Sequence, residues 1–94
     1  MNEKPVYQMS FLEKSKIRRA IDEQLQKAHK EASLHGSDRL KTHLKDYSIA
    51  VEAKLNQIFR GPPQYARPEA EYLLGAVEGV VKRIVLRNGR KDEL

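Results

Sequence analysis

The segment from residue 68 to residue 88 constrains the fold of this chain more than any other part of it. Its sequence, PEAEYLLGAVEGVVKRIVLRN, holds the densest run of large aliphatic residues, between a proline that can start a helix and Asn88-Gly89, which can stop one. Wound as a helix, it gathers its aliphatic side chains into a sector broader than the stripe of about 100° on an ordinary surface helix. We therefore predict a core helix over residues 68–87, with its main sector formed by Leu73, Val77, Val80 and Ile84, flanked by Leu74, Val81 and Val85.

A second strip on the far side of this helix combines two small-residue positions with bulky ends. It consists of Tyr72, Gly75, Ala76, Gly79 and Leu86. Each glycine costs about 1 kcal/mol relative to alanine in a helix interior, and a close backbone approach by another helix would offset that cost. The strip therefore predicts a second, closer neighbour, either the first helix of the chain or a second subunit. The G-x-x-x-G spacing is also found in membrane helix dimers, but four charges exclude a lipid-spanning segment: Glu71, Glu78, Lys82 and Arg83.

A strand is the alternative interpretation of the second half of this segment. Its residues include the β-branched Val80, Val81, Ile84 and Val85, and Asn88-Gly89 is a dipeptide typical of hairpin turns. A hairpin needs a partner strand, however, and only the polar residues 90–94 follow the turn. The helix is therefore favoured.

Two further amphipathic helices precede this segment. Ser10 and Glu13 form a capping-box pattern, and an alanine-rich stripe behind them predicts a helix over residues 11–34 that ends near Gly36. Ser37 can cap a second helix over residues 38–60, which has the most regular stripe in the chain. That stripe is formed by Leu40, Leu44, Tyr47, Val51, Leu55 and Ile58.

Residues 61–67, GPPQYAR, form the predicted linker between the second and third helices, because Gly61 can end a helix and Pro62-Pro63 cannot continue it. The fold that follows is an all-α three-helix bundle with helices at about 11–34, 38–60 and 68–87. The first two helices form a hairpin, and the third packs across them. We expect residues 1–9 to be a flexible arm, residues 10–89 a single helical domain, and residues 90–94 a polar tail.

Catalytic chemistry has little support in the residues present. Cysteine is absent, no serine lies in a G-x-S-x-G context, and the spacing of His29, His35 and His43 matches no standard zinc pattern. Gly75 and Gly79 lie inside a helix and therefore do not form a phosphate-binding loop. We predict a non-enzymatic protein, with no catalytic, cofactor-binding or metal-binding residues and no cofactor.

The basic residues give the main functional indication, because the net charge of +5 favours anionic partners. They form a cluster between Glu13 and Asp22, extended by two lysines further along the same helix, and a second cluster before Asp92. Solvated helix faces and helix C-termini also carry such charges for purely structural reasons. The candidate nucleic-acid contacts are Lys14, Lys16, Arg18, Arg19, Lys27, Lys30, Lys82, Arg83, Arg87, Arg90 and Lys91.

A protein partner is the other class of ligand that the sequence supports. An isoleucine off the second stripe and polar residues around the predicted linker are the candidate partner contacts: Ile49, Arg60, Gln64, Tyr65 and Arg67. We expect a small basic regulator or accessory factor that binds a macromolecule, with nucleic acid or a nucleoprotein slightly favoured. The alternatives are an adaptor, inhibitor or immunity-type protein that docks on a protein partner, and a structural homo-oligomer. A homodimer is compatible with each of these functions.

The predicted location is the cytoplasm. Residues 1–10 hold no apolar signal core, no window reaches a membrane-spanning length, and the lack of cysteine fits a reducing compartment. The last four residues, KDEL, spell a luminal retrieval signal, which acts only on proteins that enter the lumen. We interpret this match as coincidental.

Overall fold

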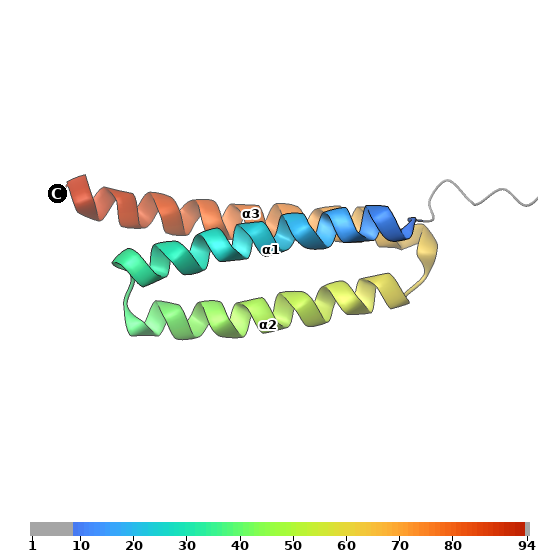
Figure 1. Ribbon diagram of the computed structural model, residues 1–94, viewed down its shortest axis with the longest axis horizontal. Helices are drawn as coiled ribbons and strands as arrows, with labels where there is room; N and C mark the ends of the chain where they lie inside the picture. The colour runs from blue at the N-terminus through green and yellow to red at the C-terminus, as the bar shows by residue number, and fades with distance from the viewer. Residues whose placement is uncertain (1–8, 94) are drawn as a thin grey trace, which may run out of the picture.

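The computed structural model describes residues 9–93, with the side chains of residues 35 and 88–93 outside the description. Three helices follow one another: α1 (Phe11–His35), α2 (Asp38–Arg60) and α3 (Pro63–Glu93). They run up, down and up: α1 and α3 are parallel to each other, and α2 is antiparallel to both (Figure 1). This is the predicted three-helix bundle, and the region considered as a strand, residues 80–85, is helical. None of the described helices has an apolar stretch that could cross a bilayer.

The first two helices begin at the predicted caps. The Ser10 hydroxyl accepts a hydrogen bond from the Glu13 backbone N–H, and the Glu13 carboxylate accepts one from the Ser10 N–H, both at 3.1 Å. This reciprocal pair satisfies two amides that have no partner inside the helix. At the start of α2, the Ser37 hydroxyl accepts from the Leu40 N–H at 3.2 Å. The capping box and the second cap are therefore both confirmed.

The turn between α1 and α2 needs a glycine for steric reasons. Gly36 has an extended backbone, with φ −89°, and its N–H donates to the Ala32 carbonyl at 2.9 Å. A methyl group at this position would approach the backbone of Ala32 to 2.9 Å and the side chain of Leu40 to 2.8 Å. The hairpin closes tightly because no side chain stands in this gap.

The predicted linker over residues 61–67 is wrong, since only Gly61 and Pro62 separate α2 from α3. Pro63 occupies the first helical position, where its missing N–H leaves no intrahelical bond unmade. Pro68 lies inside the helix rather than at its start, despite the hydrogen bond it removes. The added turn buries Ala66, which is 4% exposed, and this burial favours continued helix. At the other end, α3 continues beyond residue 87, through Asn88 and Gly89, to Glu93.

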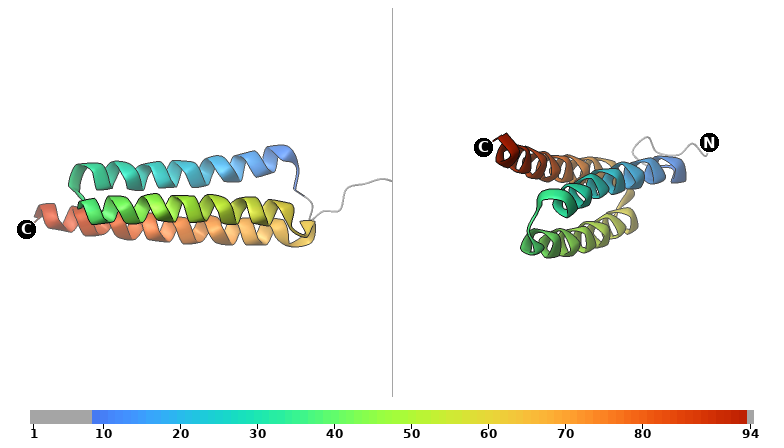
Figure 2. Two further views of the ribbon diagram at one scale, coloured as in Figure 1. Left: turned by 90° about the horizontal axis from the view of Figure 1, so that it is seen from below. Right: turned by 60° about the vertical axis from the view of Figure 1, so that its left-hand side comes forward.

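The core follows the three predicted stripes. The best-buried large side chains are Ile21, Leu55, Val77 and Val81. Ala28 and Ala32 of α1 belong to the core, and the contact of α1 with α3 is the most extensive between any two helices. Met9, which we assigned to the flexible arm, is also buried in this core; residues 1–8 of that arm lie outside the described residues. Figure 2 shows α2 and α3 lying side by side in a second view.

Among the described residues, no other helix packs against the two glycines of the second strip of α3. Tyr72 is 82% exposed and Leu86 is 52% exposed. A methyl group added at Gly75 or Gly79 would meet no atom within 4 Å. Of the two neighbours predicted for this strip, the first helix is therefore excluded, because α1 packs against the opposite sector of α3.

Burial of Val77 can be tested with one charge. Val77→Asp places an unpaired carboxylate in a site that is fully buried, which should destabilise the fold by more than about 3 kcal/mol and remove cooperative unfolding. Ala76→Asp, at the adjacent exposed position, should cost no more than about 1 kcal/mol. Thermal melting followed by circular dichroism measures both, and equal melting temperatures for the two variants would contradict this packing.

Candidate functional site

The two histidines with described side chains, His29 and His43, lie in different settings. His29 Nε2 lies 2.9 Å from the Ser48 hydroxyl, so this side chain links α1 to α2. His43 is exposed on α2. Among the described residues, no group of three histidine, aspartate or glutamate side chains is arranged to hold a metal ion.

Lys14 and Arg18, two of the predicted nucleic-acid contacts, are engaged within the bundle. Each cationic group lies 5.6 Å from the centre of the Phe59 ring on α2. Arg18 also donates a hydrogen bond to the Asn56 side chain at 3.0 Å and lies 3.8 Å from the Glu52 carboxylate. A cation over an aromatic ring contributes about 0.5–1 kcal/mol at such partly exposed sites. These two residues therefore hold α1 against α2, a role that sequence analysis missed because Phe59 lies off the main stripe of its helix.

Arg67, a predicted partner contact, is paired with Glu13. Its guanidinium donates to the Glu13 carboxylate, which also completes the capping box of α1. The hydrogen bond from the Ser10 N–H lowers the pKa of the Glu13 carboxyl, and the Arg67 charge lowers it further, against an opposing effect of burial. The pair thus joins the starts of α1 and α3 at one end of the bundle.

The other predicted basic contacts divide between two helices. On α1, four exposed cations share the face turned away from the core, with Glu23 among them: Lys16, Arg19, Lys27 and Lys30. On α3, the exposed cations are Lys82, Arg83 and Arg87. The side chains of Arg90 and Lys91 lie outside the described residues. None of these seven exposed cations forms an ion pair among the described residues.

The fold concentrates positive charge in one half of the bundle, which we call the positive end. This half contains the α1–α2 turn and consists of residues 25–51 and 79–87, which lie together at one end of the bundle (Figure 1). Its acidic residues are Glu31, Asp38 and Asp46, and its basic residues are Lys27, Lys30, Arg39, Lys41, Lys45, Lys82, Arg83 and Arg87. The other half, residues 10–24 and 52–78, carries seven basic and seven acidic residues. The net charge of +5 carried by these two halves together therefore comes entirely from the positive end.

The pKa of one tyrosine at the positive end is influenced by this positive charge. Tyr47 is half-buried between α2 and α3. Burial raises the pKa of its hydroxyl, and the positive charge of nearby Arg83 opposes that rise. Tyr47 and Arg83 lie 36 positions apart in the sequence, on consecutive helices, so only the fold shows that this cation of α3 lies near Tyr47 of α2.

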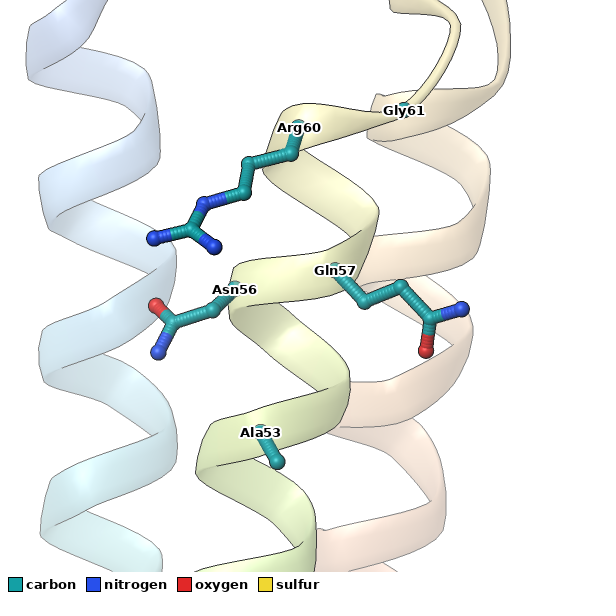
Figure 3. Close-up of a pocket in the computed structure, with 5 residues that line it drawn as sticks. All are labelled: Ala53, Asn56, Gln57, Arg60 and Gly61. Carbon is teal, nitrogen blue, oxygen red and sulfur yellow. The ribbon is translucent and has the colours of Figure 1, made fainter.

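The remaining predicted partner contacts do not lie together on one surface. Ile49 is 62% exposed on α2. Arg60 lines a shallow depression at the end of α2, with its guanidinium and the Asn56 amide directed toward α1 and Gln57 directed away (Figure 3). Gln64 and Tyr65 lie in the first turn of α3, not in a linker.

A more apolar groove lies between α2 and α3, at the end opposite the positive end. Tyr65 and Tyr72 both line it, seven residues apart on α3. The sequence pattern alone does not place these two tyrosines together, because Tyr65 falls in the predicted linker. The groove is lined by Lys54, Ile58, Tyr65, Pro68, Glu69, Tyr72, Leu73 and Ala76.

Comparisons of the chain with protein-family models, with curated proteins and with solved structures found no match. Two surfaces of the fold are candidates for a binding function: the positive end and the groove.

The pairing of Glu13 predicts how stability responds to acid. A lowered pKa in the folded state means that this carboxylate stabilises the protein above its ordinary pKa of 4.5, and that the contribution is lost as the pH falls through the folded value. Glu13→Gln keeps a side chain that can complete the capping box but removes the charge facing Arg67. The variant should melt below the wild type at pH 7, and the gap should narrow from about pH 5 to pH 3.

The matched control is Glu71→Gln, which removes an exposed carboxylate of α3 that has no partner among the described ion pairs. Melting temperatures of all three proteins across this pH range measure the effect. A gap between wild type and Glu13→Gln that stays constant with pH would show that the charge of Glu13 contributes nothing.

Proposed function

We propose that this protein is a non-enzymatic accessory or regulatory factor that binds nucleic acid or a nucleoprotein through its positive end. The observation that carries the proposal is the uneven charge. Eight basic and three acidic residues lie in the half that contains the α1–α2 turn, whereas the charges of the other half balance. A polyanion is attracted to such an end over distances of about a Debye length, and its phosphates displace bound counterions when they meet lysine and arginine.

The kind of contact follows from the side chains available. The large exposed aromatic residues, Phe11, Tyr65 and Tyr72, belong to the other half of the bundle. The positive end thus offers cations for phosphates rather than rings for base stacking, which single-strand binders use. We therefore propose backbone binding with little dependence on base sequence.

Docking on a protein partner is the second candidate function, and the groove between α2 and α3 favours it. Tyr65 is 55% exposed and Tyr72 is 82% exposed, and both line that groove. Exposed aromatic residues beside an apolar groove are typical of protein-binding surfaces. This surface lies apart from the positive end, so one molecule can use both.

Charge reversal at the positive end tests the first proposal. The probe is a fluorescently labelled DNA of 20 nucleotides, single-stranded and duplex, with binding measured by anisotropy at about 50 mM salt. Four or five phosphate contacts should make the affinity fall about 10²–10³-fold between 50 and 200 mM salt. The triple variant Lys27→Glu, Lys30→Glu and Arg39→Glu should lower the affinity at 50 mM salt at least ~30-fold.

The control has the same charge change at the other end of the bundle. Lys16→Glu, Arg19→Glu and Arg60→Glu reverse three exposed cations in the balanced half, and should lower the affinity less than about 5-fold. Equal losses in the two triple variants would show that only total charge matters. Absence of wild-type binding at 50 mM salt would exclude nucleic acid as the ligand.

A further inference from the structure

The outward face of α3 carries an apolar row, which we call the α3 seam. Its largest members, Tyr72, Tyr65 and Leu86, are 82%, 55% and 52% exposed. The smaller members between them are also exposed, apart from Gly79, which is half-buried. The α3 seam consists of Tyr65, Pro68, Tyr72, Gly75, Ala76, Gly79 and Leu86.

The spacing of the α3 seam is that of a helix that packs against another helix. Positions 65, 72, 79 and 86 recur every seven residues, and positions 68 and 75 lie three residues after the first two of them; the next position of this series is the charged Lys82. This alternation of three and four residues is the heptad pattern that keeps one seam facing a partner helix. Within the chain the opposite sector of α3, including the fully buried Val77, faces the core. The heptad row is therefore a second packing face.

The glycines supply an independent reason to expect a partner. Gly75 and Gly79 together cost about 2 kcal/mol relative to alanine in a helix interior. No neighbour in the described part of the chain requires them, since an added methyl group at either position would meet no other residue of that part within 4 Å. Small residues in a seam allow another helix to approach closely. A partner helix on this face would therefore give the two glycines a packing function.

The order of charges along α3 identifies the partner. Between residues 69 and 87 of α3, the acidic Glu69, Glu71 and Glu78 precede the basic Lys82, Arg83 and Arg87, while Arg67, just before them, is paired with Glu13 of α1. Two copies of α3 packed in parallel would bring like charges together, whereas two antiparallel copies bring the acidic part of one against the basic part of the other. We propose that the protein forms a homodimer in which two α3 seams pack antiparallel about a two-fold axis at the level of Val77.

The antiparallel arrangement pairs four of the seam positions with one another and places Tyr72 opposite Lys82 of the second copy. At this register Gly75 lies opposite Gly79 of the second copy, so the two backbones meet where neither carries a side chain. Pro68 lies opposite Leu86 of the second copy, at both ends of the contact. Glu69 lies beside Arg83 of the second copy, and the two-fold axis repeats this ion pair. The antiparallel helix dipoles add to the attraction.

The size of the contact sets the expected affinity. Residues 65–86 span about 32 Å of helix, and a single helix pair of this length buries less surface than the ~1,600 Å² of a standard protein complex. The dimer is therefore weak, with a dissociation constant in the micromolar range, and it forms on a face that contains none of the residues reversed in the nucleic-acid experiment. Failure of either proposal leaves the other standing.

One glycine substitution separates monomer stability from association. Gly79→Gln replaces a glycine with a good helix former at a site with free space, so the melting temperature in dilute solution should rise. The same side chain blocks the close approach and should weaken dimerisation at least 10-fold. Ala50→Gln, at an exposed small residue of α2, is the matched control and should leave dimerisation unchanged. Sedimentation equilibrium between about 5 and 500 μM measures the association.

Two charge reversals test the orientation of the helices. Glu69→Arg and Arg83→Glu should each weaken the dimer, because each places like charges opposite one another. The double variant restores the opposite-charge pair in an antiparallel dimer and should recover most of the wild-type affinity. A wild-type protein that is monomeric at 500 μM would overturn the proposal. So would association that Gly79→Gln leaves unchanged, or a double variant no tighter than the single ones.

Discussion

The close contact between α1 and α3 is the constraint on which the rest of the structure depends. Near both ends of this contact, small residues of one helix lie at the level of bulky residues of the other. The Glu13–Arg67 pair sets their register, so the buried Ala66 and Ala70 of α3 lie near the start of α1, at the level of Met9 and Ile17. Further along, Ala28 and Ala32 of α1 lie at the level of Val81 and Val85 of α3. Small side chains at the level of bulky ones allow the two helices to approach each other closely at both ends of the contact.

This arrangement explains why α1 can be held by so narrow an apolar face. A stripe with alanines buries less apolar surface than one of leucine and isoleucine, so it contributes less to the free energy of folding. Polar contacts at its edges supplement it. The cationic groups of Lys14 and Arg18 lie over the Phe59 ring of α2, and His29 contacts the Ser48 hydroxyl, which is also on α2. The cations that look like a nucleic-acid cluster in the sequence therefore include two whose contacts are structural.

Most of the fold could be predicted from the sequence because its signals are local. Ser10 and Glu13, or Ser37 and the stripe that follows it, fix a helix start within a few residues. The start of α3 could not be predicted in this way. Pro68 has the local appearance of a first helical residue, and the continuation back to Pro63 depends on burial of Ala66 against the rest of the bundle, which is a tertiary effect. For the same reason, the groove could not be predicted. Tyr65 and Tyr72 line it together only because α3 begins at Pro63 and includes both residues. The distribution of charge between the two halves likewise requires the up–down–up order of the helices.

The unequal charge of the two halves makes the bundle an electric dipole aligned with its long axis. The electric field of a polyanion would orient such a molecule before contact, so that its positive end approaches first. A helix of 31 residues is about 46 Å long, whereas the end of a three-helix bundle is only about 20 Å across. Each molecule bound end-on would cover about six base pairs and project outward as a post. Many copies could then stand on a short length of nucleic acid, with the exposed tyrosines of each carried well away from its surface.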